Sequence, residues 1–418
     1  MAKFLRITVV AVIVSCATAF VSACGVSGTA LPSSLVVDVS QLDPGPYSTS
    51  VHIPPESSLS AEERTVREAQ RMANYLVDPF ELNVTLTGKL DPTGILYRVR
   101  DVAEYETSGF STDGLEALTR AAAENNFAGG AWVSRGDGKR NGLQISNALL
   151  RFPDPESAAR ASAAMETAVR DWNNSPRIAF VHKVPAADIS IPGYPDGHAY
   201  HTESDYGLVS AWFATGPIVV HSTVVDSGKD AAAIASVAAG VIGKQVDLLR
   251  TFVPTPLDQL SSLMIDKEDI LTRALPFKKG DSVSPAQQAY YLPRGILHFS
   301  EDATVFQKLM VDAGVDLAGY NASVIFRTKD QVSAWRMQSA WMKAHRKGYT
   351  ELKPPSGSPE IECVKKKAEP NESAIRAADG RFQCAIAYGR YMAEVASDQQ
   401  LDLNQKAAAQ LALLVKNP

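Results

Sequence analysis

The second half of this 418-residue chain repeats, in the same order, patterns that occur in its first half. Arg151 to Asp154 precedes an alanine-rich helical pattern, and Arg327 to Asp330 precedes another. Because the paired segments keep one order and their spacing changes only by loop-sized amounts, we predict an internal duplication. The paired segments are 109–129 with 298–319, 151–154 with 327–330, the strands around Gly216 and Gly389, and 245–249 with 410–414.

Each copy predicts strands and helices in the order β-α-β-β-α. Runs of branched apolar residues predict the strands, and Asp154 and Asp330 stand at N-cap positions before a helical periodicity. We therefore expect an α+β fold of two similar modules, each an antiparallel sheet with helices on one face, ferredoxin-like in order. The expected strands are 143–151, 207–213 and 217–225 in the first copy, and 322–327, 361–364 and 382–395 in the second.

Prolines in residues 252–256 mark the boundary between the copies. A chain of this length usually exceeds what a single hydrophobic core serves. We place an N-terminal α+β module at 41–255 and a C-terminal one at 256–418. Before them, residues 24–40 are small and polar, which is typical of a flexible tether. Ser60 to Glu63 matches a capping box and predicts a helix start.

The first 23 residues have the order of a secretory signal. Lys3 and Arg6 precede an uncharged apolar run, and small residues lead up to Cys24. The segment Val21-Ser22-Ala23-Cys24 resembles the lipobox of bacterial lipoproteins, in which the peptide is cut before the cysteine and the thiol is diacylated. Since two acyl chains hold a protein stably, we expect lipidation at Cys24 and a location on the extracytoplasmic face of the cell membrane. The alternatives are an uncleaved anchor, because residues 4–23 are long enough to span a bilayer, and plain secretion.

Two cysteines remain for the folded protein. Cys16 leaves with the signal and Cys24 carries the lipid, so that Cys363 and Cys384 are left. In an oxidising compartment we expect these two to form a disulfide in the C-terminal module. A metal or redox site is the alternative, but the spacing is not C-x-x-C and no histidine stands nearby in the sequence.

Charge and motifs argue against several functions. A net charge of −5 without long basic runs argues against nucleic acid as a partner. The sequence contains no G-x-S-x-G, H-E-x-x-H or G-x-x-x-x-G-K-[ST] motif. His221 and His298 lie in apolar segments typical of core histidines, and His198 and His201 would point to opposite faces of a strand. We therefore expect no catalytic residue, no cofactor and no metal site.

One group of residues suggests a binding cleft. Trp212 and Phe213 stand on one strand, and Tyr388, Arg390 and Tyr391 stand on and next to the matching strand of the second copy. Such side chains can line an aromatic cleft between two sheets. The alternative is that they belong to the cores, where most aromatic side chains lie.

Several segments together resemble a family of actinobacterial cell-envelope lipoproteins that is described only as a domain of unknown function. They are the lipobox, the entry at 42–47, the helix at 68–73, the proline link at 252–256, and the segment around Cys384 and 388–391. The resemblance implies an envelope location and a two-part architecture, and it supplies no active-site residue.

These observations favour a non-catalytic protein that binds or scaffolds an envelope component, which would be a lipid, a glycolipid or a protein. The membrane would be reached through the lipid anchor, and a protein of a membrane complex is a further possible partner, signalled by a large exposed apolar patch. The alternative is an envelope hydrolase whose site is assembled from distant residues. A buried carboxylate or histidine with a perturbed pKa in the main cleft would favour the hydrolase, and a deep apolar groove without one would favour binding.

Overall fold

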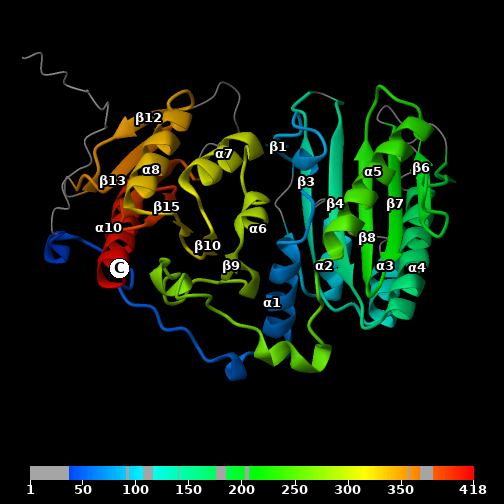
Figure 1. Ribbon diagram of the computed structural model, residues 1–418, viewed down its shortest axis with the longest axis horizontal. Coiled ribbons are helices and arrows are strands. Elements are labelled where there is room, and N and C mark those ends of the chain that lie inside the picture. Colours follow the sequence, from blue (N-terminus) through cyan, green and yellow to red (C-terminus); the bar gives the residue numbers. More distant parts are fainter. Residues whose placement is uncertain are drawn as a thin grey trace, which may run out of the picture. The chain divides into compact units, whose positions relative to one another are not determined.

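The computed structural model describes residues 37–90, 94–106, 116–139, 141–175, 185–202, 207–355, 358–367 and 380–418. The predicted signal and the predicted lipidation site Cys24 lie outside these residues. The described chain forms two antiparallel sheets, each with its own helices (Figure 1). The expected α+β fold of two modules is confirmed.

The first sheet has the strand order β1-β3-β4-β8-β7-β6-β5, and β2 also pairs with β3. Its strands are β1 (Gly88–Lys89), β2 (Gly94–Leu96), β3 (Gly130–Gly136), β4 (Gln144–Arg151), β5 (Ala187–Asp188), β6 (His198–Thr202), β7 (Leu208–Thr215) and β8 (Ile218–Val225). Its helices are α1 (Ala61–Ala73), α2 (Val99–Glu106), α3 (Glu116–Glu124), α4 (Pro155–Asn173) and α5 (Ala231–Leu249).

The second sheet has the order β12-β13-β14-β15-β11-β10-β9. Its strands are β9 (Ala289–Tyr291), β10 (Leu317–Tyr320), β11 (Val324–Arg327), β12 (Tyr349–Leu352), β13 (Ile361–Lys366), β14 (Phe382–Tyr388) and β15 (Tyr391–Ser397). Its helices are α6 (Pro293–Leu297), α7 (Ala303–Ala313), α8 (Gln331–His345) and α10 (Gln400–Lys416).

The two sheets share one strand order. The run β3-β4-β8-β7-β6-β5 of the first sheet corresponds to β10-β11-β15-β14-β13-β12 of the second. Helices α4 and α8 follow the equivalent strands β4 and β11. Both helices begin after an aspartate N-cap, Asp154 or Asp330, whose carboxylate accepts the N–H of a serine three residues later. The order β-α-β-β-α recurs in both modules, with two further strands inserted before the hairpin, as an internal duplication predicts.

The placement of the helices differs from the expectation that they cover one face. Val220 of β8 packs in a core with α1 and α5, whereas its neighbour Val219 packs in a core with α2, α3 and α4. In β14, Ile386 packs on α10, and Ala385 lies in the core that contains α7 and α8 residues. Successive strand residues face opposite sides, so adjacent apolar residues require a helical layer on each side.

A buried glutamine anchors the incoming chain in each module. Gln245 of α5 and Gln410 of α10 are both fully buried. Gln245 Oε1 accepts the N–H of Val77 at 2.8 Å, and Gln410 Oε1 accepts the N–H of Leu275 at 2.9 Å. Through Nε2 each glutamine also donates to the backbone carbonyl two residues earlier in the same segment. An unpaired buried backbone group would cost about 1–3 kcal/mol. In both modules a buried glutamine therefore satisfies the backbone N–H and C=O groups of the segment that packs on its helix.

The first described residues pack on the second module. Tyr47 and Leu59 belong to the core around α10, and the Tyr47 hydroxyl donates to Asp402 Oδ1 at 2.7 Å. Helix α1 then begins at the predicted capping box, in which Ser60 Oγ accepts the N–H of Glu63 at 3.2 Å.

Among the described helices, α5 is long and apolar enough to cross a membrane by length and composition alone. Its side chains Ile234, Ala238 and Val241 are buried in the core of the first module. A core helix and a membrane helix pass the same test of length and composition.

The predicted disulfide is present between β13 and β14. Cys363 and Cys384 are directly opposite each other in the sheet, with their Cα atoms 4.1 Å apart. Both residues face the α10 core. The bond closes a loop with a sequence separation of 21 residues.

Replacing both cysteines by serine should lower the free energy of unfolding of the second module by up to about 3 kcal/mol, because the unfolded chain gains loop entropy. Thermal unfolding followed by circular dichroism would measure the change. Wild-type protein treated with a reductant is the matched control and should unfold at the same temperature as the double variant. An unchanged midpoint in both samples would contradict the expected contribution.

Candidate functional site

One position of the shared hairpin carries different side-chain pairs in the two modules. The hairpins β7-β8 and β14-β15 both turn at a glycine with positive φ, 53° at Gly216 and 54° at Gly389. At the same distance from these turns, Trp212 stands opposite His221 in the first module, and Ala385 stands opposite Glu394 in the second. The same place in the fold therefore holds a large aromatic pair in one copy and a small residue with a carboxylate in the other.

In the first module this position is filled. Trp212 and His221 are fully buried, and their rings stack with centroids 3.6 Å apart. His221 Nδ1 lies 2.7 Å from the Tyr105 hydroxyl, and Nε2 lies 2.7 Å from Ser210 Oγ. Burial lowers the pKa of His221 to about 3. The ring is therefore neutral and hydrogen-bonded within the core, as the sequence predicted.

In the second module the equivalent face of the sheet borders a cavity of about 470 Å³. Its lining comes from α6, α7, α8, the segment before α7, strands β10, β11, β12, β14 and β15, and Lys89 of β1 in the first sheet. We call it the Glu394 cavity. Five aromatic side chains line it, namely Phe299, Phe306, Tyr320, Trp341 and Tyr349.

Glu394 brings a carboxylate to the wall of this cavity. Its cross-strand neighbours are Val324 and Ala385, which place it on the face covered by α7 and α8. Oε1 is buried and makes no hydrogen bond to any described residue. Burial raises the pKa of the carboxyl to about 7, and a hydrogen bond from the Trp341 side chain opposes this shift. The Glu394 side chain is half-buried, and its carboxyl combines a pKa near 7 with a buried oxygen that makes no hydrogen bond, which marks this cavity as the candidate site.

His345 lies next to the same wall. Its Nδ1 is 2.8 Å from the carbonyl oxygen of Trp341 and therefore donates to it. The imidazole packs on the Trp341 ring at 3.9 Å and meets the edge of Tyr349 at 4.8 Å. Burial lowers the pKa of His345, so the ring is neutral and leaves Nε2 as an acceptor.

The rim of the Glu394 cavity carries charges of both signs. Lys89 Nζ lies 3.3 Å from Glu301 Oε1, and the Glu301 side chain is 86% exposed. Asp302 caps α7, accepting the N–H groups of Thr304 at 2.9 Å and Val305 at 3.1 Å. The rim carboxylates are thus already engaged, in contrast to Oε1 of Glu394.

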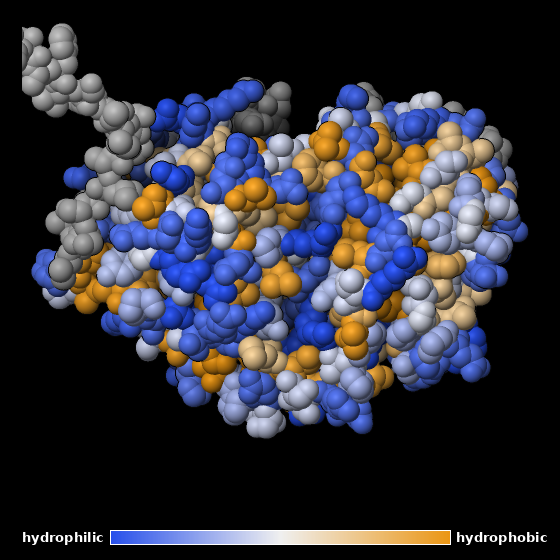
Figure 2. All heavy atoms as spheres, in the orientation of Figure 1, coloured by the Kyte–Doolittle hydropathy of each residue, from blue (hydrophilic) through white to orange (hydrophobic). Residues whose placement is uncertain are grey.

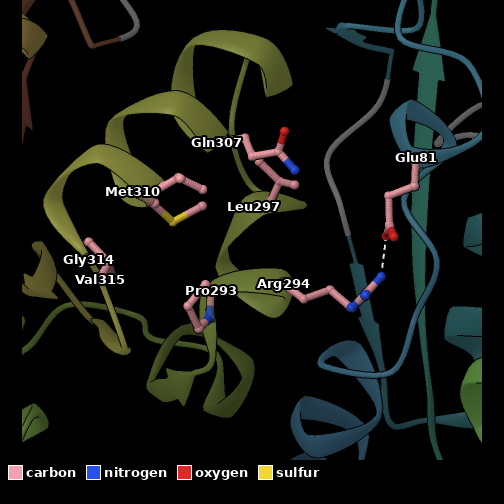
Figure 3. Close-up of a pocket in the computed structure, with 9 residues that line it drawn as sticks. Glu81, Pro293, Arg294, Leu297, Gln307, Met310, Gly314 and Val315 are labelled. Atoms are coloured by element: carbon pink, nitrogen blue, oxygen red, sulfur yellow. Dashed lines mark hydrogen bonds and ion pairs between the residues drawn. The ribbon is translucent and has the colours of Figure 1, made fainter.

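A second cavity of about 350 Å³ lies on another side of α7. Figure 3 shows Leu297 of α6 and Met310 of α7 at its wall, and Arg294 reaching from α6 to an ion pair with Glu81. Its charged groups, Arg294 and Glu81, are paired with each other, and apart from Gln307 the rest of its lining is apolar or glycine. It offers less to a specific ligand than the Glu394 cavity does.

The residues predicted to form a cleft are not brought together. Trp212 and Phe213 belong to different cores on opposite faces of the first sheet. Tyr388 and Tyr391 pack in the α10 core of the second module. Arg390 donates through Nε to the carbonyl of Thr328 at 3.0 Å. The interpretation as core residues holds for the tyrosines and for Trp212, because strand alternation separates adjacent side chains.

The sequence contains one signal for Glu394. It is a lone carboxylate in the otherwise apolar run Tyr391-Met392-Ala393-Glu394-Val395. Since side chains alternate along a strand, such a residue faces either solvent or a buried polar site. Among the described residues, no group of three or more histidine, cysteine, aspartate or glutamate side chains is placed to hold a metal ion.

Comparisons with known proteins give a family match and a likeness to solved structures. The chain matches the model described as Domain of unknown function (DUF7373) N-terminal over residues 56–265, and its C-terminal counterpart over residues 270–417. No curated protein matches the chain. The extracellular domain of PknH from Mycobacterium tuberculosis is similar at 13% identity and a TM-score of 0.28, covering 44% of this chain and 97% of that chain.

Glu394→Gln should change how stability depends on pH. Because burial raises the pKa from 4.5 to about 7, the folded state keeps a proton that the unfolded chain loses above about pH 4.5. The free energy of unfolding of the wild type should therefore fall between these two values, by about 3 kcal/mol relative to the variant, and then level off.

Denaturant unfolding of both proteins at a series of pH values would measure this difference. Glu124→Gln, an exposed position on α3, is the matched control and should keep the wild-type slope. Parallel pH dependence in the wild type and Glu394→Gln would show that the carboxyl is not held protonated.

Proposed function

The chain belongs to the DUF7373 family, and on that premise we propose that it is a ligand-binding protein whose second module holds a small amphipathic molecule in the Glu394 cavity. The observation that carries the proposal is the buried, unpartnered Oε1 of Glu394 at the wall of an aromatic cavity.

The size and lining of the cavity suit a small molecule. Ligand pockets are typically about 300–1,000 Å³, mostly apolar, with a few polar groups that fix orientation. The aromatic side chains supply apolar contact area. A buried acceptor without a partner costs about 1–3 kcal/mol, which a donor on the ligand would recover. The ligand therefore combines an apolar body with a hydrogen-bond donor.

The difference between the modules supports a division of roles. The first module fills the equivalent position with the stacked rings of Trp212 and His221, which are both fully buried. The second module has Ala385 there and leaves space beside Glu394. We assign binding to the second module and a supporting role to the first.

A hydrolase is the second candidate, because a carboxyl with a pKa near 7 suits a general acid. The serine of the cavity lining does not complete such a site. Ser300, which lines the cavity, donates to the carbonyl of Leu297 at 2.7 Å and not to a histidine or carboxylate. Binding without catalysis therefore accounts for the described geometry with fewer assumptions.

The proposed location is the extracytoplasmic face of an actinobacterial cell membrane, with a lipid on Cys24 as the anchor. The signal-like residues 1–23 and the lipobox support it, as does the Cys363–Cys384 disulfide, since disulfides persist outside the cytoplasm. The proposed ligand is then an envelope component. On the face of the described chain drawn in Figure 2, hydrophobic residues are interspersed among hydrophilic ones. This pattern gives less support to a purely structural role in a membrane complex, which a large exposed apolar patch would signal.

Gly348→Phe should block the cavity. Gly348 is an exposed residue of the cavity lining, and a Cβ added there meets no atom within 4 Å. Native mass spectrometry of protein extracted from its own membranes should detect a bound small molecule in the wild type, released unchanged on denaturation. Occupancy in the variant should fall at least tenfold, which corresponds to about 1.4 kcal/mol.

Gly240→Phe is the matched control, because its Cβ also meets nothing within 4 Å and it lies on α5 of the first module. It should retain the ligand. Equal occupancy in both variants would contradict a site in the Glu394 cavity, and recovery of a cleaved molecule would favour the hydrolase.

Cys24→Ala should abolish lipidation, because the modified thiol is removed. Mass spectrometry of the mature amino terminus, with and without globomycin, would detect the acyl groups. Cys16→Ala is the control and should leave the acyl mass unchanged. An unmodified amino terminus in the wild type would contradict the proposed anchor.

A further inference from the structure

We infer that the ligand of the Glu394 cavity is an organic ammonium ion, and that its binding displaces the proton of Glu394. This inference rests on the proposed binding function and narrows it to a chemical class. It combines the aromatic walls, the unpartnered carboxyl oxygen and the charges at the rim.

The aromatic walls suit a cation. Cations are attracted to the faces of aromatic rings within about 6 Å, most strongly to tryptophan, and the attraction grows when water is excluded. Trp341, Tyr320 and Tyr349 line the cavity together with Phe299 and Phe306. Burial raises the pKa of Tyr320, so its hydroxyl stays neutral.

The charges around the cavity also favour a positive ligand. Glu394, Glu301 and Asp302 line it, and Lys89, which is paired with Glu301, is the cation among the described lining residues. His345 is neutral because burial lowers its pKa. The lining therefore has more negative than positive groups once Glu394 ionises.

The proton of Glu394 links binding to pH. Without ligand, the Trp341 side chain hydrogen-bonds to the carboxyl while burial opposes ionisation, so the neutral acid persists up to about pH 7. An ammonium ion beside the carboxyl supplies the missing counter-charge. The ammonium keeps its proton, the carboxyl O–H bond breaks, and that proton passes to solvent. One proton is thus released per ligand bound below about pH 7, and none well above it.

A matched pair of probes distinguishes binding of an organic ammonium ion from binding of a neutral molecule. The probes are 2-phenylethylamine, which is cationic at neutral pH, and 2-phenylethanol, which has the same carbon skeleton and no charge. A neutral alcohol would bind to the protonated acid with no proton release. Its affinity would be constant or fall as the pH rises.

Isothermal titration calorimetry in buffers of different ionisation enthalpy would count the protons, using the full mature protein. At about pH 6 the amine should release close to one proton, and its affinity should rise about tenfold between about pH 6 and pH 8. Glu394→Gln should lose both the proton release and at least tenfold in amine affinity. Glu351→Gln on exposed β12 is the control and should behave as the wild type.

Two results would overturn the inference in distinguishable ways. Tighter binding of the alcohol than of the amine, without proton release, would refute the ammonium ligand and leave the binding function in place. Failure of both probes at millimolar concentration, together with no co-purified molecule in native mass spectrometry, would refute the binding function as well.

Discussion

The buried pair of Asp78 and Arg135 is the interaction on which the site depends. Both side chains are wholly buried, and Arg135 Nε donates to Asp78 Oδ1 at 2.7 Å. The other guanidinium N–H groups donate to Thr87 O, Ser300 O, Leu297 O and Ser300 Oγ at 2.9–3.3 Å. All five donors are thus used. Removing one member of such a pair leaves an uncompensated buried charge, typically at a cost of about 3–5 kcal/mol.

This pair also holds part of the candidate site. Since Ser300 lines the Glu394 cavity, Arg135 of the first module fixes one wall of the site in the second. His298 of the second module contacts the same aspartate, with its Nδ1 at 3.1 Å from Asp78 Oδ2.

Much of the fold could be predicted because local patterns determined it. The N-caps Asp154 and Asp330, the capping box at Ser60 and the Cys363–Cys384 bond all follow from short-range rules. The helices on both faces could not be predicted from the strand order, because order does not say to which side a connection crosses. Adjacent apolar pairs such as Val219 and Val220 carried that information, since both side chains are buried on opposite faces.

The site was harder to predict than the fold. The predicted cleft grouped residues by aromatic character along the chain, whereas register decides which side chains share a face. Counting residues from Gly216 and Gly389 shows, from the sequence alone, that His221 and Glu394 stand at equivalent positions of the two modules. It does not show that side chains fill the first position and leave a cavity beside the second. That depends on the covering helices. Trp341 of α8 and Tyr105 of α2 reach the two positions from elements distant in sequence.

The duplicated hairpins show how an open cavity and a stable module can coexist. Where the first module has Ala199 opposite Ala211, the second has Cys363 opposite Cys384 at the equivalent register. The next residue along β14 is Ala385, opposite Glu394. Because burial raises the pKa of Glu394 to about 7, this carboxyl lowers the free energy of unfolding by about 3 kcal/mol at pH values above 7. The disulfide raises the free energy of unfolding by up to about 3 kcal/mol in the chain-entropy model. The two changes lie side by side on β14 and face opposite sides of the sheet. The disulfide on the α10 face therefore offsets the stability that is lost through Glu394 on the α7 and α8 face. In the first module the stacked rings of Trp212 and His221 fill the position that Ala385 and Glu394 occupy in the second.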